Sequence, residues 1–215
     1  TPEFQRELGR KFRELTGIED PFREEKAQSN RVARELYHEW KPKVDASPDP
    51  FDLALRLSIA GNIMDYGANS TFDIRHTIEQ VLSARFAIDH STLLRERVTV
   101  SRNMLYLADN AGEIYFDRLF IETVRPARIT VAVRGGTALN DATPEDAREA
   151  GMEHVARVIT NGFDAPSTVL KKSSEAFLET YRQADLILSK GQGNLEGLVG
   201  EQDPRIFFLL MVKCD

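Results

Sequence analysis

The second half of the chain alternates short apolar runs with helical patterns, and this alternation restricts the fold more than any other feature. We predict strands over residues 103–107, 128–133, 154–159, 185–188 and 205–212. Helical patterns lie between them at residues 114–124, 143–151 and 167–182. Strands joined through helices run parallel with right-handed crossovers. The predicted fold class is therefore α/β, a three-layer α/β/α sandwich with a mostly parallel sheet.

The first part of the chain has helical patterns and is expected to form an N-terminal helical region. We predict helices over residues 4–16, 21–40, 51–66 and 72–87. Gly17 ends the first of them, and Pro42, Pro48 and Pro50 interrupt the chain after the second. The predicted organisation is a helical region over residues 1–95 and an α/β/α domain over residues 96–215. Because the chain starts without Met and stops just after an apolar strand, we expect both natural ends to be missing.

Composition excludes several classes of function. A formal net charge of −6 argues against a general nucleic-acid binder, which needs clustered Lys and Arg for phosphate contacts. No apolar stretch approaches the roughly 18 residues of a membrane span, and no signal peptide is visible. The single cysteine, Cys214, cannot form an internal disulfide and is expected to be a buried, inert thiol. We expect a cytoplasmic protein without a membrane or nucleic-acid partner.

Polar residues follow the predicted strands where each strand ends. Asp109 and Asn110 follow the first, Asn140 and Asp141 lie beyond the second, and Lys190 and Asn194 follow the fourth. In open parallel sheets, ligands bind outside the carboxyl ends of the strands. Asp and Asn oxygens suit Mg²⁺ or Mn²⁺, and a lysine suits a phosphoryl group. The sequence therefore favours a metal and phosphate site at this edge.

Each of these residues also has a structural interpretation. Asp109 could cap a helix, Asp141 could cap the helix that begins near Thr143, and Asn110 could be a turn residue. Lys190 could be a solvated loop lysine. Their occurrence together at the ends of separate strands counts against the structural interpretations, but spacing alone leaves both interpretations open.

Two further groups need an interpretation. Asn62, Asp65 and Asn69 share one helical face, which either ends the helix near Gly67 or lines the crevice. The glycines at positions 191, 193 and 197 are similar to a dinucleotide fingerprint, but their spacing is G-x-G-x-x-x-G rather than G-x-G-x-x-G. A dinucleotide-dependent oxidoreductase is therefore only a weak hypothesis for this chain. The Gly-rich turn can instead offer backbone N–H groups to an anion.

Four segments occur in an order that resembles a known family. They are Gly61-Asn62-Ile63-Met64-Asp65, Asp109-Asn110-Ala111-Gly112-Glu113, Arg134-Gly135-Gly136 through Asn140-Asp141-Ala142-Thr143, and Lys190-Gly191-Gln192-Gly193-Asn194. The chain resembles the damage-control phosphatase family, also called domain of unknown function 89. Thr16-Gly17, Asp20-Pro21-Phe22, Lys26 and Ser29-Asn30 are similar to its short archaeal and bacterial branch.

The resemblance implies a divalent-metal-dependent phosphatase of small phosphorylated metabolites, with Mn, Co, Ni or Mg as the metal. It places the metal on Asp109, Asn110 and Asp141, and Lys190 on the phosphoryl group. Sugar phosphates and phosphopantetheine-like or damaged phosphometabolites are the implied substrates. The chain departs from the family in having no Cys-x-x-Cys segment. Its Arg134-Gly135-Gly136-Thr137 segment is also looser than usual, so the role of Arg134 stays open.

The predicted site thus contains catalytic, substrate-binding and metal-binding residues. The catalytic set is Asp109, Asp65, Glu113 and Lys190, and the metal set is Asp109, Asn110 and Asp141. The substrate-binding set is Asn62, Asp65, Asn140, Lys190, Gly191, Gly193 and Asn194. Direct attack by water is favoured over an aspartyl-phosphate on Asp109, with Glu113 or Asp65 as general base. The alternative function is a non-catalytic module that binds a phosphometabolite or nucleotide. The oligomeric state is not predicted.

Overall fold

The structure, a computed structural model, describes residues 2–62 and 71–211, without the side chains of residues 71–73. Its strands form one five-stranded sheet in the order β3-β2-β1-β4-β5. Their bounds are β1 Met104–Leu107, β2 Ile129–Val133, β3 Arg157–Thr160, β4 Leu186–Lys190 and β5 Ile206–Leu209. Every neighbouring pair is parallel, so all five carboxyl ends meet at one edge. This confirms the predicted α/β fold class.

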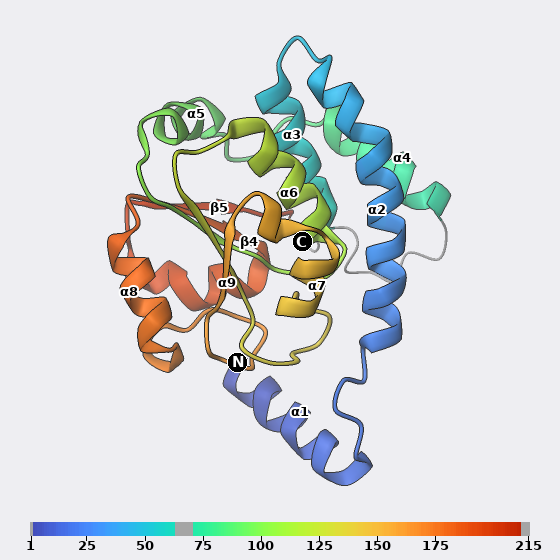
Figure 1. Ribbon diagram of the computed structural model, residues 1–215, viewed down its shortest axis with the longest axis vertical. Coiled ribbons are helices and arrows are strands. Elements are labelled where there is room, and N and C mark those ends of the chain that lie inside the picture. The colour runs from blue at the N-terminus through green and yellow to red at the C-terminus, as the bar shows by residue number, and fades with distance from the viewer. Residues whose placement is uncertain (1, 63–70, 212–215) are drawn as a thin grey trace.

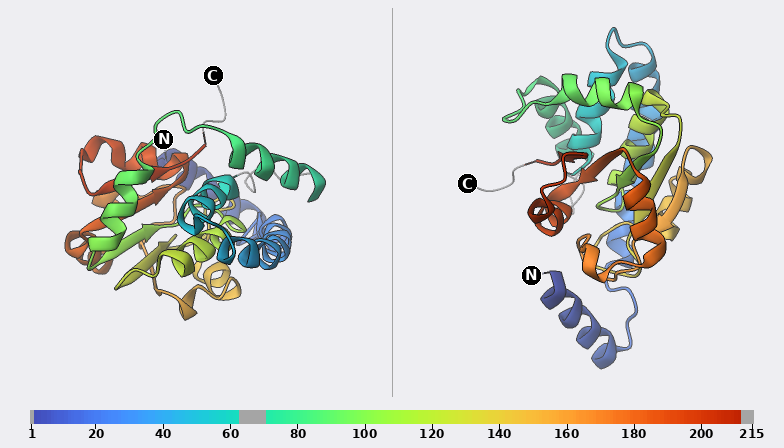
Figure 2. Two further views of the ribbon diagram at one scale, coloured as in Figure 1. Left: turned by 90° about the horizontal axis from the view of Figure 1, so that it is seen from above. Right: turned by 90° about the vertical axis from the view of Figure 1, so that its left-hand side faces the viewer.

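Helices cover both faces of the sheet, as the first two figures show (Figures 1 and 2). Side chains of β1 alternate between the faces, with Met104 and Tyr106 in one apolar cluster and Leu105 and Leu107 in the other. The first cluster includes residues of six helices: α2 Arg23–Asp45, α3 Pro50–Ala60, α4 Thr71–Ser83, α5 Ser91–Val100, α6 Glu113–Val124 and α7 Pro144–Glu149. The second includes α8 Glu175–Gln183 and α9 Gly191–Leu198. The result is the predicted three-layer sandwich.

Helices predicted as an N-terminal region pack directly on the sheet domain. Leu36 of α2 and Leu55 of α3 are buried in the same apolar cluster as Phe116 and Phe120 of α6. Residues far apart in the chain therefore share one core. The division at residue 95 stays a prediction. None of the helices in the described part of the chain is long and apolar enough to cross a membrane.

The first helix, α1 Pro2–Thr16, lies apart from the layers, beyond the carboxyl edge of the sheet (Figure 1). Its helical state was predicted correctly, but its apolar residues Phe4, Leu8, Phe12 and Leu15 are all exposed. Three arginines hold it to the body instead. Arg6, Arg10 and Arg13 all contact the carboxylate of Asp164, which follows β3.

Several predicted boundaries were wrong. Helix α2 continues through Pro42 to Asp45, and the backbone N–H of Ala46 still donates to the Pro42 carbonyl at 3.1 Å. The helix predicted from residue 167 begins only at Glu175, where the Ser174 hydroxyl caps it, after the short 3₁₀ turn Leu170–Lys172. The third strand starts at Arg157, because the 3₁₀ turn Met152–His154 precedes it. Helix α5 was predicted only as part of a helical region. Another 3₁₀ turn, Val199–Glu201, follows α9.

Phe120 tests how strongly α6 is fixed to the sheet and to the N-terminal helices. Its ring is fully buried and meets the Phe51 ring edge-on at 5.6 Å between centroids. We expect Phe120→Ala to lower the free energy of unfolding by about 3–5 kcal/mol in urea denaturation. Val199→Ala, at a position that is 57% exposed, should change it by less than about 0.5 kcal/mol. Equal effects of the two variants would contradict this packing.

Candidate active site

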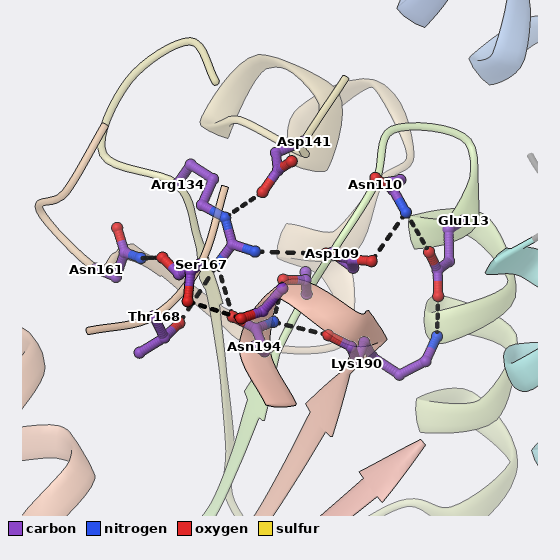
Figure 3. Close-up of polar contacts among 12 residues, drawn as sticks. Asp109, Asn110, Glu113, Arg134, Asp141, Asn161, Ser167, Thr168, Lys190 and Asn194 are labelled. Carbon is purple, nitrogen blue, oxygen red and sulfur yellow. Dashed lines mark hydrogen bonds and ion pairs between the residues drawn. The ribbon is translucent and has the colours of Figure 1, made fainter. Parts of the chain in front are cut away.

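Two loops meet at the carboxyl edge of the sheet and bring the predicted metal ligands together. Asn110 and Asp141 form an isolated antiparallel bridge. The backbone N–H of Ala142 donates to the Asp109 carbonyl at 2.8 Å, and that of Ala111 donates to the Asn140 carbonyl at 2.9 Å. The loop after β1 is thereby joined to the loop after β2. Asp109, Asn110 and Asp141 therefore lie in one cluster, although a helix and a strand separate them in sequence (Figure 3).

Arg134, at the end of β2, connects the two aspartates. Its guanidinium contacts the Asp141 carboxylate through Nε and lies 3.4 Å from Oδ1 of Asp109. It also donates to Oδ1 of Asn194 at 2.9 Å. The side chain is only 1% exposed, so both ion pairs are buried. The sequence left this residue open, and the structure places it at the centre of the site (Figure 3).

Lys190 forms a second centre of buried charge. Its ammonium lies 2.6 Å from Glu113, 2.6 Å from Asp117 and 2.9 Å from the Ser58 carbonyl. All three charged side chains are fully buried, so Lys190 is not a solvated loop lysine. Burial alone would lower the pKa of Lys190, but Asp117 and Glu113 raise it above its usual value. A contact between Lys190 and a phosphoryl group stays a prediction.

Two amides connect the halves of this cluster. Nδ2 of Asn110 donates to Asp109 at 2.9 Å and to Glu113 at 3.0 Å. Nδ2 of Asn62 donates to the same two carboxylates at 3.3 and 3.2 Å. Asn62 is buried just after α3, and its role in substrate binding stays a prediction. Asp65 and Asn69 lie outside the described residues.

The Gly-rich segment after β4 is fixed by close packing. A methyl group added at Gly191, where φ is +75°, would overlap the Asp109 carboxylate. Methyl groups at Gly193 and Gly197 would overlap the carbonyl oxygens of Pro166 and Thr168. Packing of α9 against the loop after β3, which contains Pro166 and Thr168, therefore accounts for the glycine spacing. Asn194 is buried and donates to the carbonyls of Ala108 and Lys190, while Asn140 is partly exposed.

The buried cluster has more acids than bases. Four carboxylates, of Asp109, Glu113, Asp117 and Asp141, face two cations, Arg134 and Lys190. Burial, together with the neighbouring Glu113 and Asp141, raises the pKa of Asp109 well above its usual value. A divalent cation would balance the two excess negative charges, and the oxygen donors of Asp109, Asn110 and Asp141 suit Mg²⁺ or Mn²⁺. Across the described ranges, this site included, no three His, Cys, Asp or Glu side chains are arranged as a metal-binding group, so the proposed ligand set depends on two aspartates and an amide.

Asn30, in the buried face of α2, holds the two loops that carry the proposed metal ligands, although it lies outside the site itself. Its Oδ1 accepts the backbone N–H of Gly112 at 2.7 Å, at a position where φ is +74°. Its Nδ2 donates to Asp146 and Glu149 at 3.0 Å each. Asp146 in turn accepts the backbone N–H and hydroxyl of Thr143, just after Asp141, and pairs with Lys26 at 2.8 Å. The sequence gave no role to Asn30, although a buried amide on an amphipathic helix was a usable signal.

The fold and site together define a class: α/β proteins with an acid-rich polar site at the carboxyl edge of a parallel sheet. The whole chain, residues 1–215, matches the family described as the damage-control phosphatase ARMT1-like domain. The chain belongs to this family, whose name identifies phosphatases and confirms the resemblance read from the motifs.

Relatives agree in sequence and in structure. Damage-control phosphatase PH1575 of Pyrococcus horikoshii is 40% identical over 202 residues, which cover 92% of this chain and 69% of that protein. A damage-control phosphatase of Archaeoglobus fulgidus is 35% identical over 215 residues, covering 97% of this chain and 74% of the relative. The crystal structure of the DUF89 family protein from P. horikoshii superposes with a TM-score of 0.88 at 39% identity. That match covers 95% of this chain and 72% of the other.

Lys190 tests the charge balance of the buried half of the site. Lys190→Met leaves Glu113 and Asp117 buried without their cation, which should cost about 3–5 kcal/mol of unfolding free energy at pH 7. Burial already raises the pKa of Asp117 and Lys190 lowers it, so removing the cation should raise this folded-state pKa further. The loss should therefore shrink as the pH falls toward the unfolded value of about 4. Lys172→Met, at an exposed position, is the control. A loss that does not change with pH would contradict the pairing.

Proposed function

We propose that this protein is a divalent-metal-dependent phosphomonoesterase that acts on small phosphorylated metabolites. The observation that supports it most is the excess of two buried carboxylates at the carboxyl edge of a parallel sheet, next to a Gly-rich turn. A cation-binding acid cluster beside groups that bind anions suits the transfer of a phosphoryl group to water. The family name supports the phosphatase activity.

The residues proposed to hold the metal are Asp109, Asn110 and Asp141. A bound Mg²⁺, Mn²⁺, Co²⁺ or Ni²⁺ would supply Lewis acidity toward a phosphoryl oxygen and toward water. Arg134 sets the position of both aspartates through its two ion pairs. Gly191 is needed because any larger residue would displace the Asp109 carboxylate.

The remaining predicted residues are assigned to the substrate and to proton transfer. Of the two candidates for the general base, Glu113 is the one that the structure describes. Lys190 and the amides of Asn62 and Asn110 fix its orientation. Asp65 is the other candidate. The backbone N–H groups of Gly191 and Gly193 would neutralise negative charge on the phosphoryl oxygens. For Lys190 to join them, its ammonium would have to exchange one of its three acceptors, Glu113, Asp117 or the Ser58 carbonyl, for the substrate. Asn62, Asn140 and Asn194 complete the proposed substrate-binding set.

Catalysis is tested with an aryl phosphate. We expect 4-nitrophenyl phosphate to be hydrolysed with Mn²⁺, Co²⁺, Ni²⁺ or Mg²⁺ and not after chelation. Asp109→Asn should lower kcat/KM by at least about 100-fold, because it removes a ligand charge. Asp89→Asn, at an exposed position, is the matched control. Full activity of Asp109→Asn would refute the ligand assignment.

Metal binding is tested without turnover. A ligand at 100 times its Kd stabilises the folded state by about 2.7 kcal/mol, so Mn²⁺ should raise the Tm of the wild type. Asp141→Asn should lose most of this increase. If a phosphorylated compound raises the Tm with the metal but no phosphate is released, the chain is the alternative, a non-catalytic binding module.

A further inference from the structure

A cavity of about 460 Å³ lies between α1 and the loops that follow β2 and β3. Its wall is largely apolar, and its apolar lining residues include Leu8, Phe12, Phe22, Ala138, Leu139 and Pro166. A cavity of this size is typical of small-molecule sites, which combine apolar walls with a few polar groups. We therefore asked what this cavity can bind.

The cavity adjoins the candidate active site. The carbonyl of Ala138, a wall residue, accepts the backbone N–H of Asp141 at 3.0 Å. Leu139 precedes Asp141 by two residues, so their Cα atoms are at most about 7.6 Å apart. Pro166, another wall residue, packs its carbonyl against Gly193, which lies three residues after Lys190 in sequence. The loop after β2 therefore contributes Asp141 to the acid-rich site and Ala138 and Leu139 to the cavity wall.

The charged side chains of the wall already have partners within the protein. Arg6 and Arg13 contact Asp164, and Arg13 also donates to the Thr137 carbonyl at 3.3 Å. Asp20 accepts the backbone N–H of Phe22 and lies 3.5 Å from the ammonium of Lys26. A polyhydroxylated ligand would have to exchange water for walls that offer mainly carbon, which is unfavourable. An alkyl chain would gain by leaving water.

Leu139 supports a ligand contact independently. Its φ is +48°, a left-handed conformation that is unfavourable for a bulky residue. Its side chain is 42% exposed, so packing within the protein does not account for this conformation. Residues held in such conformations gather at ligand sites. Leu139 lines the cavity and lies between Arg134 and Asp141 in sequence.

We propose that this cavity binds the organic end of the substrate, and that the substrate class is phosphomonoesters of extended, largely apolar alcohols rather than of sugars. The proposal rests on the proposed function, because the phosphoryl group would lie at the acid-rich site. Leu8, Phe12 and Leu139 then determine specificity through apolar contact with the chain of the alcohol.

The test compares ethyl, butyl, hexyl and octyl phosphate as substrates in the presence of Mn²⁺. We expect kcat/KM to rise by up to about fourfold for each added methylene until the cavity is filled. Phe12→Ala and Leu139→Asn should flatten this slope, and asparagine tolerates the left-handed backbone at residue 139. Leu15→Ala lies on the same helix outside the cavity and should leave the slope unchanged. A flat slope in the wild type, or glucose 6-phosphate preferred over hexyl phosphate, would overturn the proposal.

Binding of non-hydrolysable octylphosphonate and ethylphosphonate, measured by calorimetry, separates this proposal from the catalytic one. Tighter octylphosphonate binding that Phe12→Ala abolishes supports the cavity, even if no ester is hydrolysed. Hydrolysis of ethyl phosphate with equal binding of the two phosphonates refutes the cavity and leaves the phosphatase proposal intact. If neither phosphonate binds and no ester is hydrolysed, both proposals are wrong.

Discussion

The site depends on buried charge that the protein balances only in part. Taking ionised groups out of water is costly, and pairing recovers that cost only when the geometry is good. Arg134 pairs with the two aspartates that follow β1 and β2, and Lys190 pairs with two acids of α6. The amides of Asn62 and Asn110 donate to one acid from each pair. Two carboxylates are in excess, and burial together with Glu113 and Asp141 raises the pKa of Asp109 well above its usual value.

The sheet is what brings these charges together. Parallel strands place every carboxyl end at one edge, and the charged residues there come from three βα units. Asp109, Glu113 and Asp117 belong to β1–α6, Arg134 and Asp141 to β2–α7, and Lys190 to β4–α9. The strands alone do not fix their separation. The backbone bridge between Asn110 and Asp141 fixes it inside the site, and the Asn30 amide fixes it outside by holding the turn at Gly112 and the cap at Asp146. Helix α2 therefore contributes to the site without contacting its ligands.

Sequence patterns predicted the alternating architecture and the convergence of Asp109, Asn110 and Asp141, because apolar periodicity and topology decide both. They did not predict the partners of Lys190. Asp117 lies one turn beyond Glu113 on a helix whose other residues are mostly apolar. Two acids on such a helix indicate a buried cation, but they do not show which residue supplies it. Tertiary contacts also overrode local signals. Pro42 does not end α2, and the apolar face of α1 is not buried.

Stability and selectivity are physically separate in this arrangement. The acid-rich cluster is enclosed by the sheet, α3, α6 and α9, so changes there affect folding as well as chemistry. Helix α1 is held by arginines that share Asp164, and such partly exposed ion pairs contribute little to stability. The cavity wall that α1 forms can therefore be altered without disturbing the buried charges. In the proposed arrangement, the organic end of a phosphoester would meet this peripheral wall and its phosphoryl group would meet the buried cluster. The choice among substrates would then depend on α1 and on the loop that carries Leu139.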